Sequence, residues 1–294
     1  MQRAVRLVDL GRGVKMPLIG MGTWQVRDQQ VLLDTIDAAL RVGYRFIDTA
    51  IAYDNEQHIA NALRTLLPKH GLKRADIFIT SKLPPDRQGD AARDAVLGSL
   101  QRLQLDYLDL FLIHWPGSAD VPTTDARNVQ LRKRSWQQLE TLIDEGKLRA
   151  IGVSNYMPQH LDDLFSYARI QPSVNQCEFH PFNADMRLVN HCQQHRVHFQ
   201  AYSSLGSPMA GDALLTNTVV VELANHYKCS PSQLLLAWAM SQGISVIPRT
   251  TKVHRVSENF DATNIAVSPE DCAKLARLTV DSARRYCWDP TNVA

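Results

Sequence analysis

Four side chains suited to acid–base chemistry fall at or just after segments that predict β-strands. Asp48, Lys82 and His114 each follow an apolar or β-branched run, and Tyr53 lies five residues beyond Asp48. A tyrosine hydroxyl has an ordinary pKa of about 10 and is a poor proton donor near neutrality. A lysine ammonium beside Tyr53 would favour the phenolate and lower that pKa, and a carboxylate would keep the ammonium charged and in place.

Together these residue types suit a reaction in which a carbonyl oxygen becomes a hydroxyl. Tyr53 would donate the proton, tuned by Lys82 and Asp48, and His114 would hydrogen-bond and orient the same oxygen. The hydride would have to come from a cofactor, because no side chain supplies one. Taken singly, each residue also has an ordinary structural interpretation: a loop cap for Asp48, a surface cation for Lys82 and a buried histidine for His114.

A nucleotide cofactor would have to bind without the common glycine-rich motifs. Gly20-Met21-Gly22 begins a dinucleotide-binding fingerprint, but residue 25 is Gln, and the chain has no Walker A motif. Arg249 and Arg255, with Thr250 between them, offer guanidinium and hydroxyl groups that suit a phosphate monoester. On these residues alone, ordinary surface arginines remain the alternative interpretation.

Eight short segments predict β-strands, each followed by a segment of helical periodicity. The predicted strands are Arg45–Thr49, Asp76–Ser81, Tyr107–Ile113, Arg149–Ser154, Ser173–Gln176, His198–Ser203, Ile244–Pro248 and Phe260–Asn264. This alternation indicates an α/β fold, either an open doubly wound sheet or a closed (β/α)8 barrel, and eight strands in 294 residues favour the TIM barrel. Active sites of such barrels lie at the carboxyl ends of the strands.

Two segments are predicted to close the ends of the barrel. Val5–Asp9 and Lys15–Ile19 flank Gly11-Arg12-Gly13, a pattern that predicts an N-terminal β-hairpin across one end. The C-terminal tail, from about Leu278 to Ala294, has no clear period and is expected to form a loop over the opposite mouth. We find no linker or shift in composition, so residues 1–294 are predicted to form a single domain.

Composition and charge exclude several classes of protein. Apolar residues make up 45% of the chain and charged residues 21%, which indicates a folded globular protein. The net charge of +2 argues against a nucleic-acid binder, and the basic run Arg132-Lys133-Arg134 is predicted to be a solvated helix start. No stretch approaches the ~18 apolar residues of a membrane span. Five scattered cysteines without a C-x-x-C pair indicate reduced thiols in a cytoplasmic protein. Because the sequence shows no association helix, we expect a monomer.

One histidine pair invites a metal interpretation. His191 and His195 have i, i+4 spacing, which places two imidazoles on one face of a helix. No acidic residue of the H-E-x-x-H type lies between them, so we predict no metal site.

Four blocks of sequence resemble the aldo-keto reductases, a family of NADPH-dependent carbonyl reductases built on a (β/α)8 barrel. The resemblance runs from Gly20 to about Asn259, nearly the whole chain. The blocks are Gly43-Tyr44-Arg45-Phe46-Ile47-Asp48-Thr49-Ala50 with Tyr53 and Asn55-Glu56; Asp109-Leu110-Phe111-Leu112-Ile113-His114-Trp115-Pro116; Ile151-Gly152-Val153-Ser154-Asn155-Tyr156 with Val174-Asn175-Gln176; and Ile247-Pro248-Arg249-Thr250 with Arg255, Glu258 and Asn259.

The resemblance implies roles for these residues. Tyr53 would be the general acid, Asp48 and Lys82 would tune it, and His114 would orient the carbonyl. NADPH/NADP⁺ would be the cofactor and a small carbonyl compound the substrate. The implied cofactor contacts are Gly22, Thr23, Trp24, Ser154, Asn155, Gln176, Tyr202, Ser203, Leu205, Ser207, Arg249, Thr250, Arg255, Glu258 and Asn259. The implied walls of the substrate pocket are Trp24 and Trp115.

The chain departs from the family pattern in three places. Arg249 stands where the family usually has lysine after Ile-Pro, and the loop between Trp115 and Trp136 and the tail are short for the family, so no particular substrate is implied. One alternative is a non-catalytic NADPH-binding barrel, such as a channel-associated or structural protein, although such a role would not need all four catalytic-type residues. Another is a metal-dependent barrel enzyme, although Lys82 would repel a cation.

Overall fold

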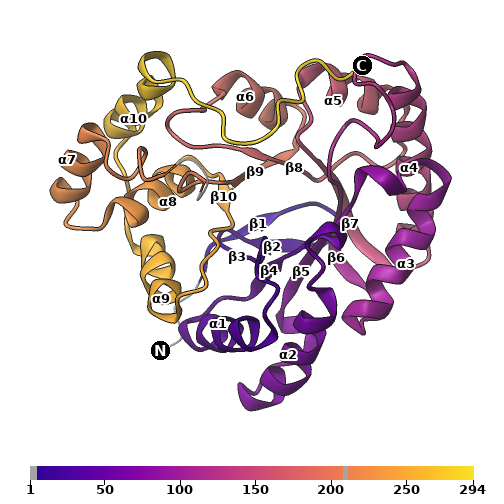
Figure 1. Cartoon of the computed structure of the whole chain (residues 1–294), viewed down its shortest axis with the longest axis horizontal. Coiled ribbons are helices and arrows are strands. Elements are labelled where there is room, and N and C mark those ends of the chain that lie inside the picture. Colours follow the sequence, from indigo (N-terminus) through magenta and orange to yellow (C-terminus); the bar gives the residue numbers. More distant parts are fainter. Residues whose placement is uncertain (1–4, 208–210) are drawn as a thin grey trace.

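A parallel sheet forms the centre of the molecule and helices surround it (Figure 1). The computed structural model describes residues 5–207 and 211–294. The strands are hydrogen-bonded in the order β10-β9-β8-β7-β6-β5-β4-β3, all in parallel. They are β3 (Met21–Gly22), β4 (Phe46–Asp48), β5 (Phe78–Leu83), β6 (Leu108–Ile113), β7 (Leu148–Ser154), β8 (Val174–Glu178), β9 (His198–Tyr202) and β10 (Ser245–Val246).

The two edge strands of this sheet meet and close it. The Val246 N–H donates to the Leu18 carbonyl, and the Gly20 N–H donates to the Val246 carbonyl, both at 2.9 Å. The strands approach so closely at Gly22 that a Cβ there would lie 2.6 Å from the carbonyl oxygen of Ile247, which excludes any other residue without a shift of the backbone. The predicted (β/α)8 barrel is confirmed.

Helices follow the strands and pack on the outside of the barrel. They are α1 (Gln29–Val42), α2 (Glu56–Lys69), α3 (Ala92–Leu103), α4 (Arg127–Asp144), α5 (Pro158–Tyr167), α6 (Met186–Gln194), α7 (Thr218–His226), α8 (Pro231–Ser241), α9 (Val253–Asp261) and α10 (Pro269–Asp281). Capping residues in the sequence determine where several of these helices begin. The Ser230 hydroxyl accepts from the Gln233 N–H at 3.2 Å, and the Ser268 hydroxyl accepts from the Asp271 N–H at 3.1 Å. Such caps satisfy N–H groups that lack partners within the helix.

One predicted strand is wrong. Phe260–Asn264 is not a strand: it forms the end of α9 and a following 3₁₀ turn. Val256, Asn259 and Phe260 are buried with helical i, i+3, i+4 spacing, and the Phe260 ring packs 4.8 Å from that of Tyr44. The eighth barrel strand is instead β3, only two residues long, which comes before all eight predicted barrel strands.

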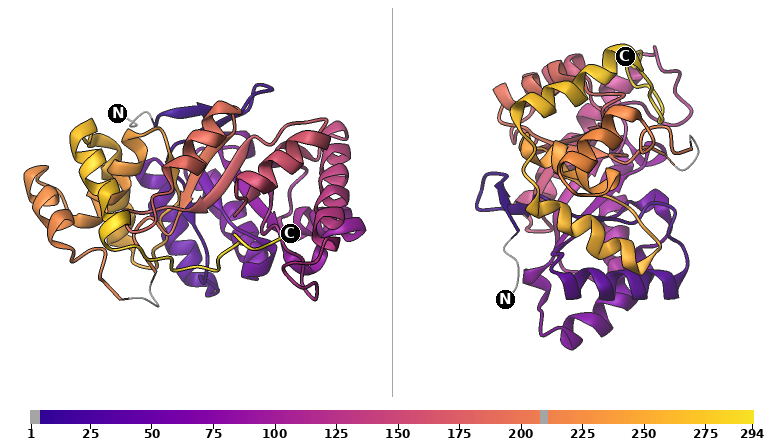
Figure 2. Two further views of the ribbon diagram at one scale, coloured as in Figure 1. Left: turned by 90° about the horizontal axis from the view of Figure 1, so that it is seen from above. Right: turned by 90° about the vertical axis from the view of Figure 1, so that its left-hand side faces the viewer.

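A hairpin and the tail cover the two ends of the barrel. β1 (Leu7–Asp9) and β2 (Lys15–Pro17) form the predicted antiparallel hairpin. Val14 and Met16 of this hairpin pack with Phe46 and other inward-facing strand residues at one end of the barrel. Figure 2 shows the C-terminal tail running past the opposite end, as predicted.

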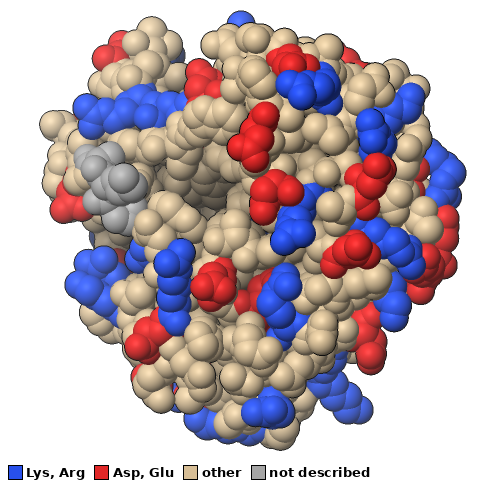
Figure 3. Space-filling view, turned by 45° about the vertical axis from the view of Figure 1, so that its right-hand side comes forward, with Lys and Arg blue, Asp and Glu red and all other residues tan. Residues whose placement is uncertain are grey.

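The basic run at residues 132–134 is solvated only in part and does not start a helix: Lys133 and Arg134 are exposed, but the run lies inside α4, which begins at Arg127. Arg132 lies within α4, is 2% exposed and donates to the Pro116 carbonyl at 3.1 Å. All five cysteines are unpaired thiols. In the described part of the chain no helix combines the length and the apolar character that crossing a bilayer requires. Lys, Arg, Asp and Glu are interspersed over the face in Figure 3, around a recess whose visible walls are mostly uncharged.

Candidate active site

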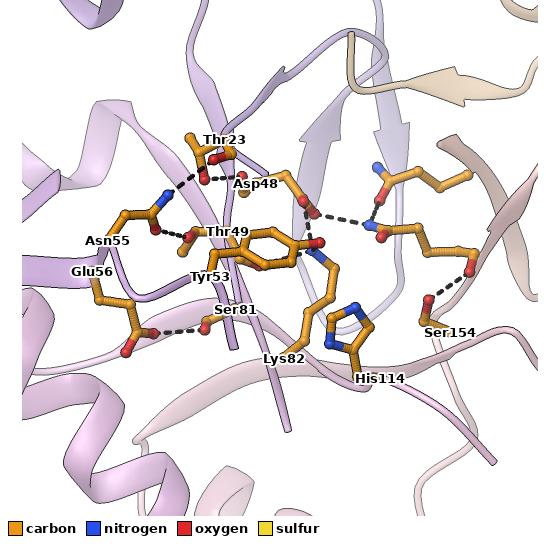
Figure 4. Close-up of polar contacts among 12 residues, drawn as sticks. Thr23, Asp48, Thr49, Tyr53, Asn55, Glu56, Ser81, Lys82, His114 and Ser154 are labelled. Atoms are coloured by element: carbon orange, nitrogen blue, oxygen red, sulfur yellow. Dashed lines mark hydrogen bonds and ion pairs between the residues drawn. The ribbon is translucent and has the colours of Figure 1, made fainter. Parts of the chain in front are cut away.

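Lys82 lies at the centre of the predicted catalytic residues. Its ammonium donates to Asp48 Oδ1 at 2.5 Å, to the Thr49 carbonyl at 2.8 Å and to the Tyr53 hydroxyl at 3.3 Å (Figure 4). The Lys82 and Asp48 side chains are 0% and 2% exposed, whereas Tyr53 is half-buried at the end of a 3₁₀ turn that follows β4. The structure therefore brings Lys82 to two residues that precede it in the chain by 34 and 29 positions.

Burial and neighbouring groups both shift the pKa values of this cluster. Burial raises the pKa of Tyr53 above its ordinary value, and the neighbouring Lys82 only partly opposes that shift. The sequence predicted the opposite net direction, because the cost of desolvating a phenolate cannot be read from spacing. Although burial alone would lower the pKa of Lys82, the interactions with the Asp48 carboxylate and the Tyr53 hydroxyl raise it, so Lys82 stays an ammonium. Tyr53 is thus protonated at neutral pH, the state a proton donor needs.

His114 lies beside Tyr53 at the end of β6. The two ring centroids are 5.7 Å apart with the rings nearly edge to face, and the buried Nδ1 of His114 has no hydrogen-bond partner among the described residues. Burial, with a further contribution from Lys82, lowers the pKa of His114 to about 3. The imidazole is therefore neutral at physiological pH, which suits hydrogen bonding to a carbonyl oxygen better than proton donation.

Two buried residues that the sequence analysis assigned no role hold the catalytic loops in place. Asn55 donates to the carbonyls of Thr23 and Val26 at 2.9 and 3.0 Å and so ties the loop after β4 to the loop after β3. Glu56 accepts from the hydroxyl of Ser81 at 2.7 Å, next to Lys82. Their only sequence signal was membership of the family-like block, because their partners lie on other strands and loops.

The residues predicted to contact a nicotinamide are linked by hydrogen bonds. Gln176 donates to Asp48 Oδ2 at 2.8 Å and to Gln200 Oε1 at 2.6 Å, which ties this set to the catalytic cluster. The Tyr202 hydroxyl donates to Asn155 Oδ1 at 2.6 Å, and the Asn155 amide donates to the hydroxyl of Ser154 at 3.1 Å. Gln200 is fully buried in the barrel and was missed, because a buried polar residue within a strand has no distinctive spacing.

The residues predicted to hold the rest of a nucleotide occupy three neighbouring regions. Gly22 pairs with Arg249 across the barrel seam, and the Thr23 N–H donates to the Asp48 carbonyl at 3.0 Å. The Arg249 guanidinium donates to the neutral side chain of Gln25 at 3.0 Å.

Further along the chain, Thr250 is buried and caps the turn before α9 by accepting from the Lys252 N–H at 3.0 Å. Arg255 is exposed on α9, and Asn259 is buried. The Glu258 carboxylate accepts from Ser230 at 2.6 Å and so already has a partner in the protein. Of this group, Arg255 is the most accessible.

The loop after β9 and the tail meet beside the cluster. Ser203 adopts a left-handed backbone conformation, with φ of 52°, and its hydroxyl lies 3.8 Å from the thiol of Cys287 in the tail. Further along the same loop, Leu205 packs against the core and Ser207 is buried. A buried carboxylate anchors the tail here: Glu178 accepts from the N–H groups of Tyr286 and Cys287 at 2.6 and 2.9 Å.

Aromatic rings stand next to His114. Trp115 stacks near it with centroids 6.4 Å apart, and Trp288 of the tail packs on Trp115 at 4.8 Å. Trp24, the other predicted pocket wall, is 39% exposed in the loop after β3. The site therefore has apolar walls beside a polar, buried cluster.

Comparisons with known proteins agree with this arrangement. Residues 18–279 match the model of the aldo/keto reductase family. The chain is 38% identical over 275 residues to a glyoxal reductase of Bacillus subtilis (strain 168), covering 93% of each chain. It is 35% identical over 286 residues to a 9,11-endoperoxide prostaglandin H2 reductase of Trypanosoma cruzi (strain CL Brener), covering 97% of this chain and 95% of that one.

Solved structures show the same likeness. An aldo-keto reductase of Bombyx mori in complex with NADP superposes with a TM-score of 0.85 at 28% identity, over 93% of this chain and 92% of that one. An aldo/keto reductase from Brucella melitensis superposes with a TM-score of 0.83 at 32% identity, over 94% of this chain and all of that one. Fold and relatives together define an oxidoreductase on a (β/α)8 barrel. The chain belongs to the aldo/keto reductase family.

Proposed function

We propose that this protein reduces an aldehyde or ketone to an alcohol with NADPH, and that Tyr53 is the proton donor. The observation that carries the proposal is the fully buried Lys82 ammonium, held between Asp48 and the Tyr53 hydroxyl. Such a cluster has no evident structural purpose, since burying an ion pair costs desolvation energy that an apolar pair of similar size would avoid.

The charges around Tyr53 favour transfer of its proton to the substrate. A carbonyl oxygen that gains negative charge during reduction would take the proton from the Tyr53 hydroxyl. The phenolate that forms would be stabilised by the Lys82 ammonium, 3.3 Å from the phenolic oxygen, and Asp48 keeps that ammonium in position. Neutral His114 would hydrogen-bond the same carbonyl oxygen and fix its orientation. Solvent would return the proton to Tyr53 after the alcohol leaves.

The donor set of the site fits NADPH, which supplies the hydride when bound. The amides of Asn155 and Gln176 suit a carboxamide, and the ring of Tyr202, held by its bond to Asn155, offers a face for stacking. The guanidinium groups of Arg249 and Arg255 suit the additional phosphate of NADPH, since bidentate donors match phosphate geometry.

Two measurements test the proposed function. Binding of NADPH is measured first, by quenching of tryptophan fluorescence. Oxidation of NADPH is then followed at about 340 nm with a panel of small aldehydes and ketones. We expect binding and turnover with at least some aldehydes. Tight NADPH binding without turnover across the panel would contradict the proposal and would favour a non-catalytic binding protein.

We also propose that the protein is a cytoplasmic monomer that acts on a small-molecule carbonyl compound. Sedimentation equilibrium on the purified chain tests the oligomeric state. A mass near 33.1 kDa is expected, and a stable dimer would contradict this part of the proposal.

A further inference from the structure

Outside the catalytic region, α5 and α6 bring together three side chains of kinds that bind metal ions. Asp162 lies on α5, His191 lies on α6 and His195 follows α6 directly. One ligand atom from each side chain lies within 4.8 Å of the others, and no other such group of three is found in residues 5–207 and 211–294. The sequence analysis predicted no metal site because no acid lies between the histidines; the fold supplies the acid from the neighbouring helix.

We propose that Asp162, His191 and His195 form a binding site for one divalent transition-metal ion, Zn²⁺ being the ion that best fits these ligands. Two imidazoles and one carboxylate are a ligand set that zinc accepts, with water in the fourth position. The i, i+4 spacing points both imidazoles from one face of α6, and the carboxylate faces them from α5. The site thus bridges two helices on the outside of the barrel.

The distances are compatible with such a site after small side-chain movements. His191 Nε2 already lies 2.9 Å from Asp162 Oδ1. Zinc bonds of about 2.0–2.2 Å in a tetrahedral arrangement place ligand atoms roughly 3.3 Å apart, so no pair has to approach by more than roughly 1.5 Å. Asp162 and His195 are exposed side chains, which can move this far without repacking the core.

An aromatic ring packs beside the two imidazoles. The Phe165 ring of α5 stacks on that of His195 with centroids 4.4 Å apart and an interplanar angle of 19°, and it lies 6.2 Å from the His191 ring. His191 Nε2 is shielded from solvent and makes no well-aligned hydrogen bond to the described residues. A metal ion between His191 Nε2 and Asp162 Oδ1, which lie 2.9 Å apart, would bond to both atoms.

Binding would act on stability rather than on the reaction. The ion would join α5 to α6, which follow β7 and β8, and it would lie on the outer surface of the barrel. A ligand that binds only the folded chain shifts the unfolding equilibrium in favour of the folded state, about 100-fold when the free ligand is at about 100 times its Kd. The thermal midpoint should therefore rise when zinc is added.

Calorimetric titration of the reduced, metal-free protein with ZnCl₂ tests the site. The full chain should bind one ion at the site, and His191→Ala and His195→Ala should each weaken binding at least about tenfold, since each removes one of three ligands. His226→Ala is the matched control, because His226 is an exposed histidine at the end of another helix, α7. It should bind zinc as the original protein does.

Two further variants make the outcome of the titration decisive. Asp162→Asn should weaken zinc binding and should lower the zinc-dependent rise in thermal midpoint; it serves if a histidine variant fails to fold. A Cys229→Ser and Cys287→Ser background removes the two cysteine thiols that are not buried. Zinc affinity that is unchanged in both histidine variants, or that is lost equally in His226→Ala, would overturn the proposal. Failure of this test would leave the proposed reductase activity untouched, because no step uses enzyme turnover.

Discussion

Replacing Lys82 with Met should destabilise the barrel by about 3–5 kcal/mol, the cost of removing one partner of a buried ion pair. The expectation follows from burial: the Lys82 and Asp48 side chains are 0% and 2% exposed, and their charged atoms are 2.5 Å apart. Without Lys82, the Asp48 carboxylate keeps only its bond from Gln176. The carbonyl of Thr49 also loses its donor. Met has a similar length, so the loss of volume is small.

Urea unfolding, followed by tryptophan fluorescence and by circular dichroism, measures this difference in the free energy of unfolding. The double variant Asp48→Asn with Lys82→Met removes both charges and should recover much of the lost stability. Lys274→Met, at an exposed position, should change stability by less than about 0.5 kcal/mol. A loss below about 1 kcal/mol for Lys82→Met, or a double variant as unstable as the single one, would show that the buried, unpaired Asp48 carboxylate is not what destabilises the protein.

Three further predictions concern the surroundings of the cluster. Because burial lowers the pKa of His114 to about 3, kcat/KM should show no His114 inflection between about pH 5 and 8; an inflection near pH 6.5 that disappears in His114→Gln would contradict this. Glu178→Ala removes two charge-assisted bonds to the tail, so a maleimide should label Cys287 at least about tenfold faster. Equal labelling of Glu178→Ala and the exposed control Glu222→Ala would contradict the anchoring role. Arg255→Ala should raise KM for NADPH roughly 10- to 100-fold and leave KM for NADH unchanged; equal effects on both would exclude phosphate binding.

Much of the barrel could be predicted because its strands and helices carry local patterns. Apolar runs such as Tyr107–Ile113 and caps such as Ser230 are signals contained within a few residues. The strand Met21–Gly22 could not be predicted, since two residues carry no periodicity and its existence depends on closing the sheet against β10. The strand predicted at Phe260–Asn264 is wrong because Phe260, with Val256 and Asn259, belongs to the buried face of α9.

In the candidate site, too, some features could be predicted from the sequence and others could not. Asp48, Lys82 and His114 could be singled out because charged or polar residues at the ends of apolar runs are conspicuous. The shift in the pKa of Tyr53 could not be predicted, because its direction depends on how completely the ring is removed from water. Glu178 gave no signal either, since the N–H groups that it accepts from lie more than 100 positions away in the chain.

Replacing Tyr53 with Phe is the most direct test of whether the hydroxyl of Tyr53 donates the proton. The ring is kept, and the hydroxyl's one described partner, Lys82, retains its bonds to Asp48 and Thr49. We predict that kcat for aldehyde reduction falls about 10²- to 10⁴-fold while the Kd for NADPH stays within about twofold. A Tyr53→Phe protein that binds NADPH normally and keeps kcat within about threefold of the original value would contradict the account.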